Sequence, residues 1–190
     1  MIDKYEVTHF GGAPIVLNML ANAPKDQQKE LKRKVYVLTA GAPPPSIIFE
    51  KMKKLGFEVM HVYGLTETYG HILQCAWNDE WDGLDQDNQN EIKARQGVRY
   101  PNTEGVVVMD PETMKPIPHD GKTMGEIMIR GNVVMKGYFK DKEATEKSME
   151  GGWFHSGDLA VTHPSGYIKI QDRSKDCLLY TSPSPRDLTA

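Results

Sequence analysis

The chain has 190 residues, of which 39% are hydrophobic and 26% are charged, and its formal net charge is −3. These values are typical of a soluble globular protein with one domain, or with one domain and part of another. The small acidic excess gives no electrostatic reason to expect a nucleic acid or an anionic membrane as partner, and no apolar run of about 18 residues predicts a membrane span.

The two cysteines, Cys75 and Cys177, lie far apart and match neither a metal-ligand spacing nor a disulfide framework. This pattern favours a reducing, intracellular setting, either cytoplasmic or organellar, with the peroxisome and the mitochondrion both included.

The first elements in chain order predict a βαβ unit. Residues 13–24 read as a short helix with prolines in its first turn and at its end. Residues 34–41 are a β-branched apolar run closed by glycine, which indicates a buried strand. A helix at 45–56 and a second strand at 57–64 follow, and such a unit makes two parallel strands by a right-handed crossover.

Parallel pairing places the loops that follow the two strands at one edge of the sheet. These loops are residues 41–45 and 63–68. Since open α/β sheets bind ligands at the carboxyl ends of their strands, we expect both loops to open on one crevice.

The second half of the chain has a different residue pattern. Residues 78–96 are polar and rich in Asp, Asn, Gln and Glu, and we interpret them as a surface excursion. Short apolar runs separated by Pro, Asp and Gly then predict hairpins, with strands at 105–110, 125–131, 158–163 and 167–172 and one helix at 141–149. The predicted fold class is therefore α/β, with a βαβ part of a mainly parallel sheet followed by a small antiparallel, barrel-like subdomain.

The loop at 63–68 has residues that suit a phosphorylated ligand. Gly64 lets a ligand approach the backbone, Thr66 offers a hydroxyl and an N–H to a phosphate, and Glu67 is a hard oxygen ligand of the kind that binds Mg²⁺. Tyr63 could stack on a flat base. The alternative is a plain turn in which Thr66 is a local cap and Glu67 faces water.

Four further residues have two interpretations each. Gly41 and Ala42 leave room for a nucleobase, or they belong to an ordinary strand-to-helix turn. Asp158 could accept hydrogen bonds from the vicinal hydroxyls of a ribose, or it could satisfy its own hairpin turn. Arg173 could pair with Asp158 or a phosphate, or it could be a solvated strand end.

The histidines form no metal spacing. His9, just before a helix, is the one most suited to lining a pocket, although an ordinary partly buried histidine is the default for both His9 and His61. The glycine-lysine phosphate loop of many nucleotide enzymes is absent from the 190 residues.

Five stretches nevertheless occur in a familiar order, and over residues 5–176 they resemble the successive core motifs of the acyl-activating (AMP-forming) adenylation enzymes. That superfamily includes acyl-CoA synthetases, firefly luciferase and the adenylation domains of peptide synthetases. The resemblance is greatest to plant and bacterial acyl-CoA ligases. The five stretches are residues 39–45, 63–68, 125–139, 151–160 and 172–176.

The resemblance implies a two-step reaction with ATP, Mg²⁺ and coenzyme A. ATP and a carboxylic acid give an acyl-adenylate and pyrophosphate, and coenzyme A then takes the acyl group as a thioester with release of AMP. The alternatives are a nucleotide-binding fragment without turnover of its own and a peptide-synthetase-type adenylation domain.

The resemblance also implies where the nucleotide binds. Gly41, Ala42 and Pro43 would border the adenine, with Tyr63 on its face, and Gly64 would also contact the nucleotide.

The remaining implied roles concern the phosphates, the metal, the ribose and the hinge. Thr66 would contact the phosphate and Glu67 would hold Mg²⁺, so both are catalytic. Asp158 would bind the ribose with Arg173 beside it, and Lys175 falls at the hinge of the family.

The acyl pocket would be lined by His9, residues 11–17, Gly70 and His71. The phosphate loop and the lysine of the small C-terminal domain that the family requires are not in the chain, so we expect it to be an internal fragment of a longer enzyme. After Asp176 the sequence departs from the family pattern, and we expect this tail to be disordered and non-native. The expected divisions are therefore 1–100, 101–172, a hinge at 173–176 and a tail at 177–190.

Overall fold

The computed structural model describes residues 2–28, 31–41 and 44–173. Three predicted site residues and the tail therefore lie outside the described residues, namely Ala42, Pro43, Lys175 and residues 177–190.

The chain divides into two compact units. The first unit comprises residues 1–66 and 70–100, and the second comprises residues 67–69 and 101–190. The short stretch 67–69 therefore belongs to a different unit from the residues on either side of it.

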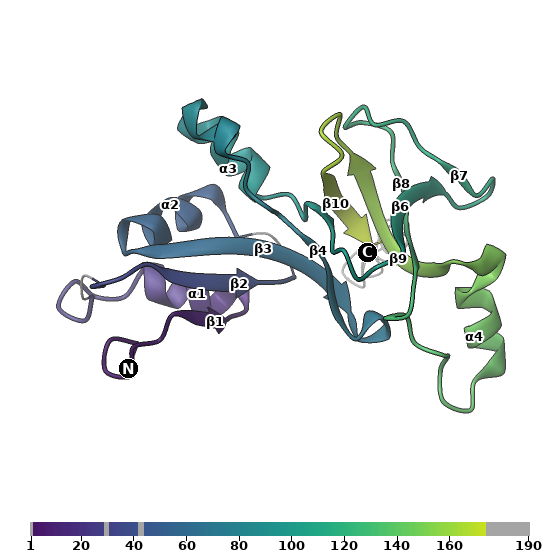
Figure 1. The fold of residues 1–190 in the computed structure, drawn as a ribbon, viewed down its shortest axis with the longest axis horizontal. Helices are drawn as coiled ribbons and strands as arrows, with labels where there is room; N and C mark the ends of the chain where they lie inside the picture. The colour runs from purple at the N-terminus through teal and green to yellow at the C-terminus, as the bar shows by residue number, and fades with distance from the viewer. Residues whose placement is uncertain (1, 29–30, 42–43, 174–190) are drawn as a thin grey trace, which may run out of the picture. The chain divides into compact units, whose positions relative to one another are not determined.

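The first unit is built on a five-stranded sheet in the order β1-β2-β3-β4-β5 (Figure 1). The first three strands are parallel, whereas β4 and β5 pair antiparallel to their neighbours. The parallel pairing of β2 with β3 confirms the predicted βαβ unit. The strands are β1 (His9–Gly11), β2 (Val35–Thr39), β3 (Phe57–Leu65), β4 (Gly70–Gln74) and β5 (Val98–Arg99).

Helices α1 (Pro14–Ala21) and α2 (Ser46–Lys54) pack on one face of this sheet. Strand β2 alternates buried and exposed side chains, as expected for a strand with one covered face. The buried core that results consists of Leu17, Ala21, Val35, Val37, Ile48, Phe49, Met52, Phe57 and Val59. On the opposite face, Tyr36 and Leu38 stay 46% and 38% exposed.

Residues 78–96, interpreted from the sequence as a polar surface excursion, contain two helical elements. They form the 3₁₀ helix η2 (Asp79–Gly83) and helix α3 (Gln86–Lys93). Both start on a polar cap: the Asn78 side chain accepts from the Glu80 N–H, and the Asp85 side chain accepts from the Asn88 N–H. The segment has few apolar residues to reveal a helical period, so capping and the burial of Ile92 decide its structure.

The second unit is a five-stranded antiparallel sheet in the order β10-β9-β8-β6-β7 (Figure 1). The central strand β8 buries five consecutive residues, which include the charged Glu126. Its elements are β6 (Gly105–Asp110), β7 (Lys115–Pro116), β8 (Gly125–Arg130), α4 (Lys142–Ser148), η3 (Glu150–Gly152), β9 (Phe154–Thr162) and β10 (Ile168–Arg173).

The antiparallel half was predicted correctly, but the sheet is not closed as a barrel would be. Strands β10 and β7 lie at opposite ends of the strand order, and no pairing joins them within the described residues. Among those residues no helix has the length and apolar character needed to cross a bilayer.

Candidate active site

The stretch 63–70, predicted to be a loop, is the end of β3 and a tight connection to β4. Strand β3 continues to Leu65, and residues 66–68 form the single 3₁₀ turn η1 (Thr66–Thr68). The backbone then reverses through Tyr69 and Gly70, whose φ angles are 56° and 132°. The reversal makes β4 antiparallel to β3.

Gly64 is required by the neighbouring strand, not by a left-handed backbone. A Cβ at this position would lie 1.9 Å from the carbonyl oxygen of Gly70 and 2.4 Å from the Cα of His71. The sequence analysis assigned this glycine to ligand approach, but the structure shows that close passage of β4 already excludes a side chain.

Tyr63, in β3, and Thr66, in the turn η1 that follows it, differ in solvent exposure. The Tyr63 side chain is buried at 8% exposure, which leaves little ring surface for a stacked base. Thr66 is exposed, so its hydroxyl and backbone are accessible to a ligand.

The loop after β2 begins beside β3, as the parallel topology predicted. The carbonyl oxygen of Gly41 lies 3.1 Å from the Nε2 atom of His61, which sits in β3. Gly41 has a φ of +94°, a backbone conformation that favours glycine.

His61 is almost fully buried, with both ring nitrogens facing backbone carbonyl groups. The second nitrogen, Nδ1, lies 3.3 Å from the Ala94 oxygen. Burial lowers the pKa of His61, although the hydrogen bonds to the backbone oppose this. The neutral ring has one N–H and therefore donates to one of the two carbonyls. The prediction of an ordinary buried histidine did not anticipate that His61 connects β3 to the Gly41 loop.

Glu67 lies in η1 and belongs to the second unit. Its backbone oxygen accepts a hydrogen bond from the Met135 N–H at 2.7 Å, and its Oε1 atom accepts from the Tyr138 hydroxyl at 3.1 Å. The side chain is half-buried.

The surroundings of Glu67 fit a Mg²⁺ ion that is held mainly by phosphates. The part of the chain that the structure describes contains no group of three or more His, Cys, Asp or Glu side chains that could enclose a metal. Mg²⁺ often binds through one or two carboxylates together with substrate phosphates, and a single accessible carboxylate suits that mode.

Asp158 lies inside β9, whereas the sequence predicted a strand start. The β8–β9 register shifts here, because Glu126 is opposite Leu159 while Met128 is opposite His155. Three residues of β9 therefore bulge against one residue of β8. Asp158 is 5% exposed, and its N–H donates to the Ser156 hydroxyl at 3.1 Å.

Arg173 is the direct neighbour of Asp158 in the β9–β10 pair, where the two residues are register partners. The resemblance implies that Arg173 lies beside Asp158 at a ribose, and that role stays a prediction.

The predicted acyl-pocket residues lie in different places on the first unit. His9 stacks on Tyr36 with ring centres 5.0 Å apart, whereas the His71 ring contacts the edge of Tyr100 at 4.9 Å. His9 lines a cavity of about 790 Å³ along β1, β2 and β3, and neither Gly70 nor His71 is among the described residues that line it.

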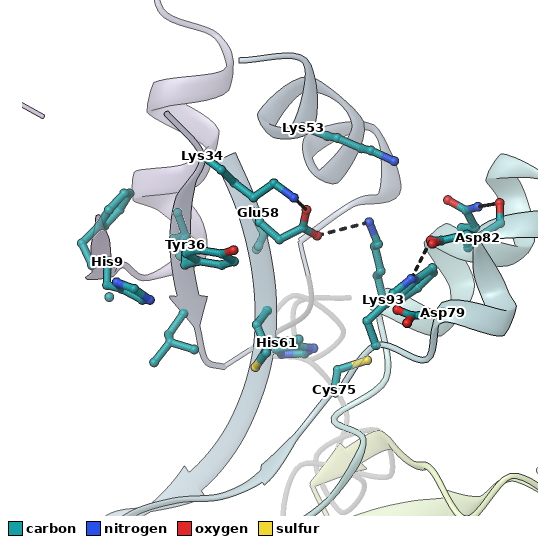
Figure 2. A pocket seen from close by; sticks show the side chains of 18 residues that line it. His9, Lys34, Tyr36, Lys53, Glu58, His61, Cys75, Asp79, Asp82 and Lys93 are labelled. Atoms are coloured by element: carbon teal, nitrogen blue, oxygen red, sulfur yellow. Dashed lines mark hydrogen bonds and ion pairs between the residues drawn. The ribbon is translucent and has the colours of Figure 1, made fainter. Parts of the chain in front are cut away.

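A chain of charged groups crosses this cavity (Figure 2). Glu58 lies 3.8 Å from both Lys34 and Lys93, and Lys93 lies 4.9 Å from the centre of the Trp77 ring. Burial lowers the pKa of Lys93. These contacts connect α3 to the sheet, and the sequence analysis assigned none of them.

Three more interactions in the second unit were missed. The Glu126 carboxylate accepts from the Gly157 N–H and contacts His155, and Tyr138 contacts Glu67. The only sequence signal was that these residues fall within stretches already quoted as motifs, at 125–139 and 151–160.

The fold combines a mainly parallel α/β sheet with a separate antiparallel sheet. The AMP-binding enzyme family model matches residues 1–139, and the chain belongs to that family.

The relatives and solved structures agree with this assignment. The chain is 56% identical over 181 residues to the peroxisomal acetate/butyrate–CoA ligase of Arabidopsis thaliana, and 57% identical over 180 residues to an acetate–CoA ligase of Humulus lupulus. Each match covers 94% of this chain and 32% of the relative, so the chain spans about a third of their length. The O-succinylbenzoate coenzyme A synthetase of Bacillus subtilis, solved with ATP and a magnesium ion, is 26% identical with a TM-score of 0.74, covering 92% of this chain and 33% of that one.

Proposed function

We propose that the longer protein containing this chain is an AMP-forming acyl-CoA ligase. It would join a carboxylate to the α-phosphate of ATP with loss of pyrophosphate, and the thiol of coenzyme A would then displace AMP from the acyl-adenylate. The observation that carries the proposal is the 56–57% identity, over 94% of this chain, to proteins named as acetate or butyrate ligases. Because the chain spans a third of those relatives, the activity is assigned to the longer protein.

The proposed substrate is a short-chain aliphatic acid such as acetate or butyrate. The names of the two relatives support this choice. An intracellular compartment is proposed with it, and the peroxisomal relative favours the peroxisome among the organelles.

The chain would contribute the nucleotide and metal contacts. Gly41, Ala42, Pro43, Tyr63 and Gly64 are assigned to the adenine. The support is the position of Gly41 beside β3 and its glycine-requiring backbone. The burial of Tyr63 favours an edge contact over a stacked base.

The other roles are supported by side-chain exposure at Thr66 and Glu67 and by backbone register at Asp158. Thr66 is assigned to the phosphates and Glu67 to Mg²⁺, both supported by their accessibility. Asp158 is assigned to the ribose hydroxyls with Arg173 as its neighbour, and Lys175 to the hinge.

The acid-binding residues are the remaining assignment. His9, Gly70 and His71 are proposed to contribute to the acyl pocket. The accessibility of all three residues supports this role.

The experiment is acid-dependent exchange of labelled pyrophosphate into ATP, followed by thioester formation with coenzyme A, in the longer protein. Acetate and butyrate should support both steps, and omission of Mg²⁺ should abolish them. Glu67→Gln should lower exchange by about 100-fold, the scale for losing a group that stabilises charge in the transition state. The matched control is Glu104→Gln, because Glu104 forms an exposed ion pair with Arg130 at 2.8 Å. Absence of exchange with every acid tested would contradict the function, and unchanged exchange in Glu67→Gln would remove the metal assignment.

A second outcome is expected for the 190-residue chain alone. It spans a third of its relatives, so we propose that it binds nucleotide without turning it over. Exchange by the isolated chain would contradict this, and acyl transfer to a carrier protein instead of coenzyme A would support the peptide-synthetase alternative.

A further inference from the structure

The segment between β8 and α4 is anchored at Gly137 and Tyr138. Gly137 has a φ of +152°, and a Cβ there would lie 2.5 Å from the Cγ2 atom of Thr145. The Tyr138 N–H donates to the Thr145 hydroxyl at 2.9 Å, and that hydroxyl donates to the Asp141 oxygen at 2.7 Å. The first turn of α4 therefore fixes the backbone of Tyr138.

The opposite side of the same segment holds Glu67. The Met135 N–H donates to the backbone oxygen of Glu67 at 2.7 Å, and the Tyr138 hydroxyl donates to its Oε1 atom at 3.1 Å. Glu67 thus has its main chain and its side chain bound by one short segment that begins 68 residues later (135 − 67 = 68).

The two carboxylate oxygens of Glu67 differ in their surroundings. Oε1 accepts from Tyr138, whereas Oε2 has no hydrogen-bond or ion-pair partner among the residues that the structure describes. Tyr138 is 39% exposed and Glu67 is half-buried, so the pair is accessible to a ligand from solution.

We propose that Tyr138 is a positioning residue for the metal-binding carboxylate of Glu67. Its hydroxyl occupies Oε1 and leaves Oε2 for a divalent cation bound to the phosphates of ATP, while Thr145 keeps Tyr138 in place. The inference rests on the proposed function, because it requires that Glu67 binds the cation. Partners of this kind orient the ligands of many metal sites.

The test measures metal binding directly. The affinity of Mn²⁺·ATP for the longer protein is determined by the electron paramagnetic resonance signal of free Mn²⁺, beside the affinity of ATP without metal. Tyr138→Phe should weaken Mn²⁺·ATP binding by about 10- to 100-fold, the range for losing an outer partner of a metal ligand. The affinity for metal-free ATP should stay the same, which a general structural defect would not produce.

Two further variants and a control separate positioning from folding. Thr145→Val removes the hydroxyl that accepts from the Tyr138 N–H, and it should weaken Mn²⁺·ATP binding, whereas Thr145→Ser should restore it. Tyr5→Phe removes the same group from an exposed tyrosine whose hydroxyl has no recorded partner among the described residues, and it should behave as the wild type.

The other possible results of these binding measurements would contradict the role of Tyr138, the metal site or the proposed function. Wild-type affinity in Tyr138→Phe, together with loss of Mn²⁺·ATP binding in Glu67→Gln, would overturn the role of Tyr138 and leave the proposed function intact. Wild-type affinity in Glu67→Gln would overturn the metal site and the inference with it. If the unmodified protein binds no ATP at all, the proposed function itself is wrong.

Discussion

The Glu126 carboxylate crosses from β8 to β9 and accepts the backbone N–H of Gly157 at 2.7 Å. Because Gly157 lies in the β9 bulge, its N–H has no regular pairing with the backbone of β8. The Glu126 carboxylate accepts this N–H in place of a backbone carbonyl. The second carboxylate oxygen lies 3.2 Å from the Nδ1 atom of His155, and both side chains are largely buried. The bulge next to Asp158 is therefore supported by a side chain of the neighbouring strand.

Replacement of Glu126 should release this bulge. Glu126→Ala should lower the free energy of unfolding by about 2–3 kcal/mol, the scale for a hydrogen bond to a charged group that is lost with its partner left buried. It should also weaken ATP binding, because Asp158 follows Gly157 directly. Glu126→Gln keeps an acceptor for Gly157, so its effect on both quantities should be smaller.

Chemical denaturation and ATP titration of the longer protein measure these effects. Glu104→Gln serves as the control, since its exposed ion pair with Arg130 should contribute less than about 1 kcal/mol. Equal losses in Glu126→Ala and Glu104→Gln would rule out a special role for Glu126.

A methyl group at Gly64 should disrupt the β3–β4 connection. The new Cβ would stand 1.9 Å from the backbone oxygen of Gly70, which cannot move aside as a flexible side chain could. Gly64→Ala should therefore cost about 3 kcal/mol, at the upper end of the scale for overpacking. Gly83→Ala is the matched control, because a Cβ at Gly83 meets nothing within 4 Å. Thermal unfolding of both variants distinguishes them, and equal midpoints would contradict the close passage of β4.

The buried His61 should make stability depend on pH in the mildly acidic range. Burial lowers the pKa of His61 in the folded chain, so the unfolded chain takes up the proton first as the pH falls. The contribution to stability is complete above the ordinary histidine pKa of about 6.5 and is lost below it, by at most about 1.4 kcal/mol per pH unit for one proton.

Chemical denaturation at pH values from about 7 to about 5, the range in which an ordinary histidine titrates, measures this dependence. His61→Gln should flatten the decline, because the side chain no longer titrates. A slope unaffected by His61→Gln would show that another group is responsible.

The exposed apolar side chains of the first unit should limit the solubility of the 190-residue chain. Met19 on α1 and Leu38 on β2 are 68% and 38% exposed. Their replacement by lysine should reduce the binding of an apolar dye and the precipitation of the chain, because less apolar surface then meets water. Ser165→Lys, in the β9–β10 turn, adds the same charge to a polar exposed position and should change neither quantity. If the unmodified chain and the double lysine variant bind the same amount of dye, this expectation is contradicted.

Several elements follow from local sequence alone. The β-branched run at 34–41 and the helical spacing at 45–56 predicted β2 and α2 because each pattern matches one backbone period. Parallel connectivity then placed the Gly41 loop beside β3, which the contact with His61 bears out.

Other features could not be predicted from local pattern. The polar segment that contains α3 shows no strong apolar period, so its caps and the burial of Ile92 decide that it is helical. The open form of the second sheet depends on which edge strands meet, and that is a property of the whole sheet.

The sequence by itself therefore determined the βαβ unit, the hairpin strands of the second half, the family motifs and the candidates Thr66, Glu67 and Asp158. Only the tertiary structure decided that Gly64 makes room for β4, that Glu126 supports the bulge beside Asp158 and that Tyr138 binds Glu67. The physical reason is that local patterns follow from backbone periods within a few residues. A contact between residues 31 or 71 positions apart depends instead on strand register, bulges and turns that form when the whole unit packs.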